Sequence, residues 1–321
     1  MNSVMITGCA GFIGSYVAEE FINAAYKVIG VDVLTYAGFE ENMSSFIDNP
    51  NFIFHQMDIN VTNGIKMFAE QEDVKWIINL AAETHVDNSI KSADVFIKSN
   101  IQGTKSILDA CRKLDIPLLQ FSTDEVYGVA VNRSFTERSS LLPQNPYSAT
   151  KAAGDHMIQA YANTYGTKHI IVRPSNNFGL RQHDEKFLPT IIRKLKAGEK
   201  IPVYGKGNQI REWTHARDTA KATRFILENS TADWRKSPAY NEIYNISSGF
   251  HTENMNVVQM VCDNLGLRIE DCIEHVPDRL GHDFKYSISS RKLENIGHTV
   301  YTNFEKDLKE IIDYEFNSIR N

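Results

Sequence analysis

The chain has 321 residues, enough for one large domain or two closely joined ones with a sizeable core. Its formal net charge is -6 and it has no long run of Lys or Arg, so neither nucleic acid nor a membrane surface is expected as a partner. Cys9, Cys111, Cys262 and Cys272 lack the spacing of a zinc site or a disulfide framework, and no metal is expected. Because there is no signal-peptide pattern and no apolar stretch of membrane-spanning length, we expect a cytoplasmic protein with reduced thiols.

Short apolar segments alternate with longer amphipathic ones through the first half of the chain, the pattern of repeated βαβ units. Pro146 favours a helix start just after it. From Pro174 onward, glycines and prolines interrupt the pattern, and such irregular regions often carry ligand contacts. The expected strands are Val4–Thr7, Lys27–Asp32, Phe52–Gln56, Trp76–Leu80, Leu118–Ser122, His169–Arg173 and Tyr244–Ile246. The expected helices are Phe12–Ala24, Ile65–Gln71, Ile101–Leu114, Tyr147–Tyr165, Lys186–Lys196, Ala216–Glu228, Met255–Leu265 and Phe304–Phe316.

These elements predict an α/β protein with a Rossmann-type doubly wound parallel sheet and a smaller interleaved α/β substrate-binding domain. The chain contains no flexible linker, so we expect the two domains to alternate along it. The sheet domain is expected to comprise residues 1–174 and about 210–246, and the smaller domain residues about 175–209 and 247–321.

A glycine-rich turn follows the first expected strand. Gly8, Gly11 and Gly14 open the first helix, where the backbone must turn tightly and approach a pyrophosphate. Asp32 ends the second strand, where a carboxylate accepts hydrogen bonds from ribose hydroxyls and repels a 2′-phosphate, so NAD is favoured over NADP. Glycines alone are weak evidence for a dinucleotide site. An Asp after a strand is at least as often a turn residue as a ribose ligand. Asp58-Ile59 and Leu80-Ala81-Ala82 also follow strands and are expected beside the cofactor.

Five polar residues in the middle of the chain have the chemistry of a dehydrogenase. Tyr147 and Lys151 share one face of the expected helix, so the ammonium favours the phenolate and makes the tyrosine a usable base near neutral pH. Thr123, Asp124 and Glu125 follow an apolar strand and stand at the carboxyl edge of the sheet, where such sheets bind ligands. Two adjacent carboxyls add a second acid and base, which indicates oxidation coupled to elimination. Taken alone, the adjacent acids could equally be a solvated turn, and the Tyr/Lys pair could equally be exposed residues on a helix surface.

With several further motifs, these residues resemble the extended short-chain dehydrogenase/reductases, specifically the nucleotide-sugar 4,6-dehydratases. The resemblance covers nearly the whole chain. The motifs that carry it are TGCAGFIG at 7–14, DVLTYAG at 32–38, AAETHVD at 81–87, STDEVYG at 122–128, PYSATK at 146–151, SNNFG at 175–179, YGKGNQIR at 204–211 and DRLGHD at 278–283.

The resemblance implies a cycle of oxidation, elimination and reduction. Tyr147 would take the proton of the sugar 4-hydroxyl while hydride passes from carbon 4 to NAD, with Lys151 and Thr123 polarising the site. The new ketone acidifies the carbon 5 proton, which Glu125 would remove while Asp124, protonated, gives its proton to the departing 6-hydroxyl. Hydride then returns to carbon 6, giving a 4-keto-6-deoxy sugar and regenerating the cofactor. Adjacent carboxyls in a partly dry crevice can separate their pKa values in this way.

The resemblance also implies the binding residues and an assembly. Related enzymes commonly pair through the helices expected at Ile101–Leu114 and Tyr147–Tyr165, so the expected partners are a nucleotide-sugar substrate and a second copy in a homodimer. Arg211 and Arg279 would hold the diphosphate, because a guanidinium donates two parallel hydrogen bonds. The cofactor-binding residues would be Gly8, Gly11, Phe12, Ile13, Gly14, Asp32, Leu34, Thr35, Asp58, Ile59, Leu80, Ala81, Ala82, Ser99, Tyr147, Lys151 and Asn177. The substrate-binding residues would be Thr84, Thr123, Asn176, Lys186, Pro202, Tyr204, Arg211, Asn245, Arg279 and His282.

Three alternatives stay open. A nucleotide-sugar 4-epimerase shares the glycine turn and the Tyr/Lys pair but has no use for Asp124 and Glu125. A GDP-mannose 4,6-dehydratase typically has Ser at the position of Asp124. A non-catalytic NAD-binding regulator could share the fold, but it would be free to lose any of these side chains. The base is open too: residues 179–186 differ from the bacterial dTDP-glucose pattern and residues 84–89 resemble eukaryotic UDP-glucose 4,6-dehydratases, so both nucleotides are retained.

Overall fold

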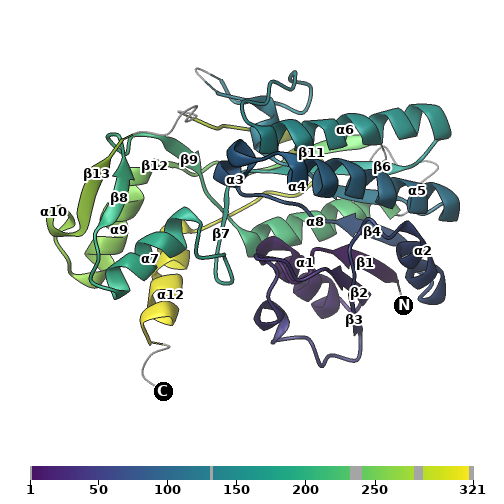
Figure 1. The fold of residues 1–321 in the computed structure, drawn as a ribbon, viewed down its shortest axis with the longest axis horizontal. Coiled ribbons are helices and arrows are strands. Elements are labelled where there is room, and N and C mark those ends of the chain that lie inside the picture. The colour runs from purple at the N-terminus through teal and green to yellow at the C-terminus, as the bar shows by residue number, and fades with distance from the viewer. Residues whose placement is uncertain (1, 131–132, 232–240, 278–284, 318–321) are drawn as a thin grey trace.

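A seven-stranded parallel sheet is the centre of the molecule (Figure 1). The computed structural model describes residues 2–130, 133–231, 241–277 and 285–317. The strand order is β11-β6-β5-β4-β1-β2-β3. These strands are β1 (Ser3–Thr7), β2 (Lys27–Asp32), β3 (Phe52–Gln56), β4 (Trp76–Asn79), β5 (Leu118–Phe121), β6 (His169–Pro174) and β11 (Glu242–Ile246).

The strand order changes direction beside β1. From β1 the chain adds β2 and β3 on one side, and it then crosses to β4, β5 and β6 on the other. Thr7 pairs with both Val31 and Asn79, so the carboxyl ends of β1, β2 and β4 lie together. Ligands of open α/β sheets bind at such a switch point, so the topology places a crevice where the sequence predicted one.

Helices cover both faces of the sheet. α1 (Phe12–Asn23) and α8 (Ala216–Thr231) pack on one face, where Phe21 and Ile226 join the same apolar core. α2 (Thr62–Gln71), α5 (Thr104–Leu114) and α6 (Pro146–Tyr165) cover the other face. The predicted doubly wound fold is thereby confirmed, and the buried strands read as continuous apolar runs because neither face meets water.

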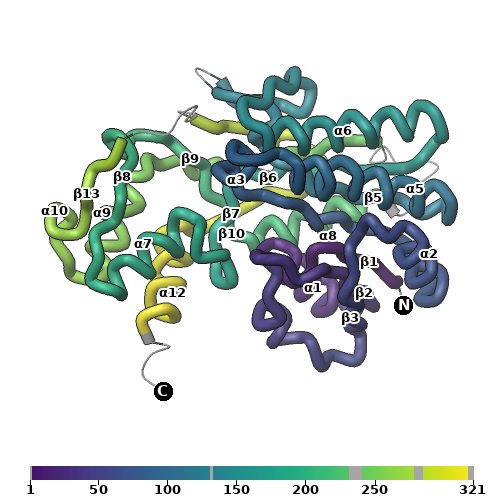
Figure 2. The backbone as a smooth tube through the Cα atoms, viewed as in Figure 1, coloured from purple at the N-terminus to yellow at the C-terminus, as the bar shows by residue number. Residues whose placement is uncertain are grey.

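A second, smaller group of elements has its own core and lies to one side of the main sheet (Figures 1 and 2). Phe178, Trp213 and Phe304 meet in this core, so segments far apart in the sequence build it together. The residue bounds given for the two domains stay a prediction. The group contains α7 (Phe187–Lys196), β8 (Ile201–Tyr204), β9 (Ile210–Glu212), β12 (His251–Glu253), α9 (Asn254–Leu265), α10 (Ile269–Cys272), β13 (Ile273–Val276) and α12 (Phe304–Asn317).

Several short elements were not predicted. Three two-stranded sheets pair β8 with β13, β9 with β12, and β7 (Asn177–Phe178) with β10 (Thr214–His215). They have two to four residues each, too few for a periodic pattern. The other unpredicted pieces are the helices α3 (Val86–Lys91), α4 (Asp94–Phe96), α10 and α11 (Arg291–Asn295) and the 3₁₀ turns Glu40–Met43 and Asp124–Tyr127.

The helix predicted from Ile101 is preceded by a π-helical segment, Ile97–Gly103, and α5 begins only at Thr104. Within that segment, Asn100 is buried and its amide donates to the carbonyl of Glu83 and to Thr150 Oγ1, both 3.0 Å away. A buried amide of this kind breaks the apolar period from which helix starts are predicted.

A buried ion pair ties α6 to the sheet. Arg173 in β6 donates to Asp155 Oδ2 in α6 from Nε at 3.0 Å and Nη2 at 2.8 Å, and both side chains are 2% exposed. Ser122 Oγ donates to the same oxygen at 3.0 Å. Arg173 Nη1 also donates to Tyr127 Oη at 2.8 Å, and that hydroxyl donates to Asn245 Oδ1 at 2.9 Å. Every member is satisfied, which makes the network a rigid link between β5, β6, β11 and α6.

We predict that Arg173→Met lowers the free energy of unfolding by about 3–5 kcal/mol, because it leaves the Asp155 carboxylate buried without its cation. Urea denaturation measures this. The matched control is Lys309→Met, which removes an exposed partner of Asp313 and should leave the urea midpoint unchanged. Equal midpoints for the two variants would show that the network does not hold the fold.

Candidate active site

A cleft of about 550 Å³ opens at the carboxyl ends of β1, β2, β4, β5 and β6. It is lined by all five candidate catalytic residues, Thr123, Asp124, Glu125, Tyr147 and Lys151. The predicted cofactor residues that line it are Gly8, Gly11, Phe12, Ile13, Gly14, Asp32, Thr35, Asp58, Ile59, Leu80, Ala81, Ala82, Ser99 and Asn177. The topology thus gathers into one cavity predicted residues from eight separate stretches of sequence.

The glycine turn forms a close-fitting cradle at one end of the cleft. Gly8 has φ +71°, and a Cβ built on it would lie 2.7 Å from the Ala81 nitrogen. A Cβ on Gly14 would lie 1.9 Å from the Gly8 carbonyl oxygen. Only glycine fits at these two positions, and the N-terminus of α1 consequently faces the cleft, which suits a pyrophosphate.

Asp32 stands beside the cradle and is fixed by backbone amides. Its Oδ2 accepts from Ala10 N at 3.0 Å and its Oδ1 from Leu34 N at 2.9 Å. A Cβ at Gly38 would come within 2.9 Å of Oδ1, so the loop after β2 must be small there. The carboxylate is thereby presented to the cleft in one orientation, as a ribose ligand requires. Leu34 itself is not among the described residues that line the cavity; its contribution is this backbone hydrogen bond.

The two adjacent acids occupy different environments. Thr123 begins a 3₁₀ turn, and its Oγ1 accepts from Glu125 N and donates to Asp124 Oδ1, each at 3.3 Å. Asp124 is buried, and burial, followed by the charge of Glu125, raises its pKa well above the usual value for an aspartate. Glu125 is only partly buried and accepts a hydrogen bond from Asn145 Nδ2 at 3.3 Å. The inner carboxyl is therefore biased toward its protonated form, whereas the outer one is partly open to solvent and hydrogen-bonded by an amide.

The start of α6 carries Tyr147 into the cleft. Asn145 and Ser148 form a reciprocal capping box around Pro146, which fixes where the helix begins. The Tyr147 backbone N–H, which lacks a helical partner, donates to Ser89 Oγ at 3.2 Å. One turn later, Lys151 Nζ donates to the Phe121 carbonyl at 2.6 Å, at the end of β5. The pair predicted from the sequence is thus anchored to the strand that carries the acids.

The sequence predicted that Lys151 lowers the pKa of Tyr147 enough to make it a base near neutral pH. The protein's own side chains do not lower it in this way. Burial, and after it the charge of Glu125, raises the pKa of Tyr147, whereas a hydrogen bond with Thr123 lowers it. Burial also lowers the pKa of Lys151 to about 8. The sequence spacing identified Tyr147 and Lys151 as a pair but not how deeply the two side chains are buried, and burial is the largest cause of both pKa shifts.

The predicted substrate residues fall into three groups: those that line the cleft, those that do not, and those outside the described residues. Thr84, Asn176 and Lys186 line the cleft. Pro202, Tyr204, Arg211 and Asn245 are not among the described residues that line it; Asn245 is fully buried and bound to Tyr127. Arg279 and His282 lie outside the described residues.

A polar cluster at the mouth of the cleft was missed by the sequence prediction. Glu185 Oε2 lies 3.5 Å from His85 Nε2 and 3.6 Å from His183 Nδ1, and its Oε1 lies 3.7 Å from Lys186 Nζ. Glu83 also lines the cleft, and burial raises its pKa. The available signal was the density of charged residues in the loop at 179–186, from which only Lys186 was predicted to bind the substrate.

The chain was compared with known proteins and structures. A model described as the NAD dependent epimerase/dehydratase family matches residues 4–247. The chain is 40% identical to the low-salt glycan biosynthesis protein Agl12 of Haloferax volcanii, with 97% of each chain covered. It is 35% identical to a dTDP-glucose 4,6-dehydratase of Haemophilus influenzae, with 99% of each covered. A solved dTDP-glucose 4,6-dehydratase of Streptomyces venezuelae, DesIV with NAD bound, has a TM-score of 0.91 and 34% identity, covering 99% of this chain and 98% of that one.

These findings confirm the resemblance seen in the sequence and NAD as the cofactor. The cradle around Gly8 and Gly14 and the fixed carboxylate of Asp32 fit that dinucleotide. In the described residues no helix is both long and apolar enough to cross a bilayer.

We predict that Lys151→Met stabilises the fold by about 1–3 kcal/mol at pH 7 while abolishing any reaction that needs the ammonium. The folded-state pKa of about 8 lies below the unfolded value of roughly 10.4, so the charged form is penalised in the fold at pH values below 8. That cost disappears as the pH rises through the unfolded value. Urea denaturation at pH 7 and pH 10.5 measures the difference, with Lys113→Met, an exposed lysine, as control. A stability gain that is the same at both pH values would contradict the burial argument.

Proposed function

Because the chain belongs to the NAD-dependent epimerase/dehydratase family, we propose that it is a nucleotide-diphosphate-glucose 4,6-dehydratase. It converts dTDP-glucose or UDP-glucose into the 4-keto-6-deoxyglucose nucleotide and water. The observation that carries the proposal is the pair of adjacent carboxyls in unlike environments, with Asp124 buried and Glu125 only partly buried in the same cleft. An elimination needs one acid and one base, and this pair supplies both.

The first step is oxidation at carbon 4. Tyr147 takes the proton of the sugar 4-hydroxyl. Thr123 shares a hydrogen bond with Tyr147 and polarises the sugar 4-oxygen. Bound NAD supplies the hydride acceptor for carbon 4 and later the hydride donor for carbon 6. Lys151 keeps its position through the Phe121 carbonyl and remains largely charged at pH 7, so it favours the phenolate form of Tyr147 that accepts the proton.

The second step removes water across carbons 5 and 6. Glu125 takes the carbon 5 proton, which the neighbouring ketone has acidified, and Asp124 protonates the 6-hydroxyl as it leaves. Burial raises the pKa of Asp124, which favours the protonated form that this role requires. Asn145 holds Glu125 from the start of α6, so the base and Tyr147 are positioned by the same helix.

The expected homodimer is part of the proposal, as is the assignment of Thr84, Asn176 and Lys186 to the sugar nucleotide. Lys186 Nζ lies 3.4 Å from the Thr84 carbonyl, so these two lining residues belong to one wall of the cleft. Burial lowers the pKa of Lys186, and the charge of Glu185 opposes that effect. A cation held in this way suits an anionic ligand.

A nucleotide-sugar 4-epimerase is the second candidate, since the family contains both activities by name. It would use Tyr147 and Lys151 alike. It would have no role for the buried carboxyl of Asp124, and burying such a group is costly.

Turnover without added cofactor tests the proposal. Purified protein is incubated with dTDP-glucose and with UDP-glucose, and products are read by mass spectrometry. Loss of one water from either substrate is the expected result, and the faster substrate identifies the base. An isomer of unchanged mass would establish the epimerase, and no reaction with either substrate, in protein that releases NAD on denaturation, would favour the non-catalytic regulator.

Glu125→Gln is predicted to retain bound NAD and the first oxidation, but to slow water loss by at least about 100-fold, because the amide cannot accept the carbon 5 proton. Exchange of solvent deuterium into carbon 5 should slow by a similar factor. Water loss at the normal rate in this variant would contradict the assigned base.

Tyr147→Phe is predicted to block the cycle one step earlier, since no group then accepts the 4-hydroxyl proton. A transient absorbance of NADH at 340 nm is expected from Glu125→Gln and not from Tyr147→Phe. Finding that transient in Tyr147→Phe would exclude the phenol as the base of the oxidation.

A further inference from the structure

Two loops that are far apart in the sequence both line the cleft and contact each other. The β2–β3 loop comprises residues 33–51, and the β7–α7 loop comprises residues 179–186. The His183 ring stacks on Phe39, with ring centroids 5.6 Å apart and an interplanar angle of 10°. It also meets the Tyr36 ring edge-on, with centroids 5.5 Å apart. Aromatic contacts therefore join the two loops directly.

Arg181 ties the β7–α7 loop to α1 and to the β2–β3 loop at once. Its Nη2 donates to Glu19 Oε2 at 2.9 Å and to Ser45 Oγ at 3.3 Å. Its guanidinium carbon lies 4.9 Å from the centre of the Tyr16 ring. The Arg181 and Glu19 side chains are 22% and 28% exposed, so most of this ion pair is shielded from water.

The backbone at Arg181 is held in a conformation that it would not adopt by itself. Its φ of +69° lies in the left-handed region, which is unfavourable for a residue with a Cβ. Two residues earlier the loop presses on α1: a Cβ on Gly179 would lie 3.2 Å from Tyr16 Oη and 3.3 Å from the Phe12 ring. A strained residue persists only where its surroundings hold it, and here the side-chain contacts of Arg181 do so.

Both loops are anchored to the glycine turn that forms the cradle. Phe39 N and Asn42 Nδ2 donate to the Ala10 carbonyl, at 3.1 and 2.8 Å, and so fix the β2–β3 loop on that turn. The β7–α7 loop rests on α1, which begins in the same turn. The contacts thus close a ring that runs from the turn through Phe39 and His183 and back along α1. Gly11 and His183, on this ring, both line the cleft.

We propose that Arg181 and His183 close a clasp over the cofactor end of the cleft, so that the two loops must part before NAD leaves. Arg181 is not among the described residues that line the cleft, so it acts by positioning its loop and not as a ligand. The proposal rests on NAD binding and holds for a dehydratase and an epimerase alike. In either cycle the hydride removed from the sugar is returned to it, and slow release of the cofactor prevents its loss.

The experiment measures NAD release from whole protein loaded with isotope-labelled NAD, by adding an excess of unlabelled NAD and following the label that stays bound. Arg181→Gln removes the ion pair and the contact with Tyr16, so release should become about fivefold faster. Arg224→Gln is the matched control. Arg224 pairs at 2.8 Å with Glu20, the residue after Glu19, but it joins α1 to α8 and touches neither loop. Its release rate should be unchanged.

Glu19→Gln separates the clasp from direct contact with NAD. Glu19 is not among the described residues that line the cleft, so its effect on release must pass through its partners Arg181 and Ser45. Release should become about threefold faster, and Glu20→Gln should leave it unchanged. In the double variant of Arg181 and Glu19 the acceleration should be smaller than the product of the two single effects, because both remove one contact. An acceleration equal to that product would contradict the ion pair as the latch.

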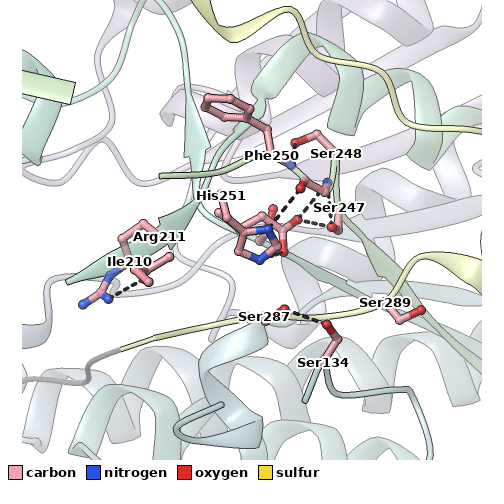
Figure 3. Close-up of polar contacts among 12 residues, drawn as sticks. Ser134, Ile210, Arg211, Ser247, Ser248, Phe250, His251, Ser287 and Ser289 are labelled. Atoms are coloured by element: carbon pink, nitrogen blue, oxygen red, sulfur yellow. Dashed lines mark hydrogen bonds and ion pairs between the residues drawn. The ribbon is translucent and has the colours of Figure 1, made fainter. Parts of the chain in front are cut away.

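His183→Gln removes the stacking on Phe39 and should speed release about threefold. His251→Gln is its control. Figure 3 shows the His251 ring beside Ser247, in the smaller group of elements. The two histidine side chains are 25% and 27% exposed and each lies near a glutamate, but His251 is not among the described residues that line the cleft. Its variant should release NAD at the normal rate.

Normal release from Arg181→Gln, or an equal acceleration in Arg224→Gln, overturns the clasp. Normal release from His183→Gln, or an equal acceleration in His251→Gln, removes the aromatic contact from it. NAD release is measured without a sugar nucleotide, so failure of the clasp leaves the proposed function standing, and absence of water loss leaves the clasp standing.

Discussion

The buried ion pair of Arg173 and Asp155 is the constraint on which the geometry of the cleft depends. One carboxylate oxygen of Asp155 receives Ser122, at the end of β5, and both Nε and Nη2 of Arg173, from β6. Asp155 lies on α6, the helix that carries Tyr147 and Lys151. The distance between the tyrosine and the acids that follow Ser122 is therefore set by a network that never touches the substrate. A site of this kind works only when such supporting contacts are fixed.

Chemically similar groups in the cleft differ in their proposed roles because they differ in burial. Asp124 and Glu125 are neighbours in sequence, yet burial raises the pKa of the first while an amide of α6 binds the second. The same depth acts on Lys151, whose pKa falls to about 8. The pKa values of Asp124 and Lys151 are thus shifted by desolvation first and by neighbouring charges second.

Much of the fold and of the cofactor end could be predicted because those features are local. Gly8 and Asp32 each follow a strand, and their meaning comes from a strand and helix close by in sequence. Arg173 could not be recognised as a structural centre, since a charged residue at a strand end is normally solvated and its partner lies in another element.

The substrate end was harder for a different reason. In the smaller group of elements, Glu212 on β9 lies opposite His251 on β12 through the pairing of two three-residue strands, which have no detectable period. Asn245 was expected at the substrate, yet its position inside the Tyr127 network depends on packing that spacing does not reveal. Motifs predicted which residues gather at the carboxyl edge of the sheet, but not which of them are too deep to reach a ligand.

The most direct test of the central claim follows a single hydrogen. Nucleotide-glucose carrying deuterium at carbon 4 is incubated with the protein and no added cofactor, and the product is examined by NMR and mass spectrometry. Oxidation, elimination and re-reduction with a retained cofactor predict a product lighter by one water, with the deuterium at carbon 6. Deuterium that returns to carbon 4 in a sugar of unchanged mass would contradict the account.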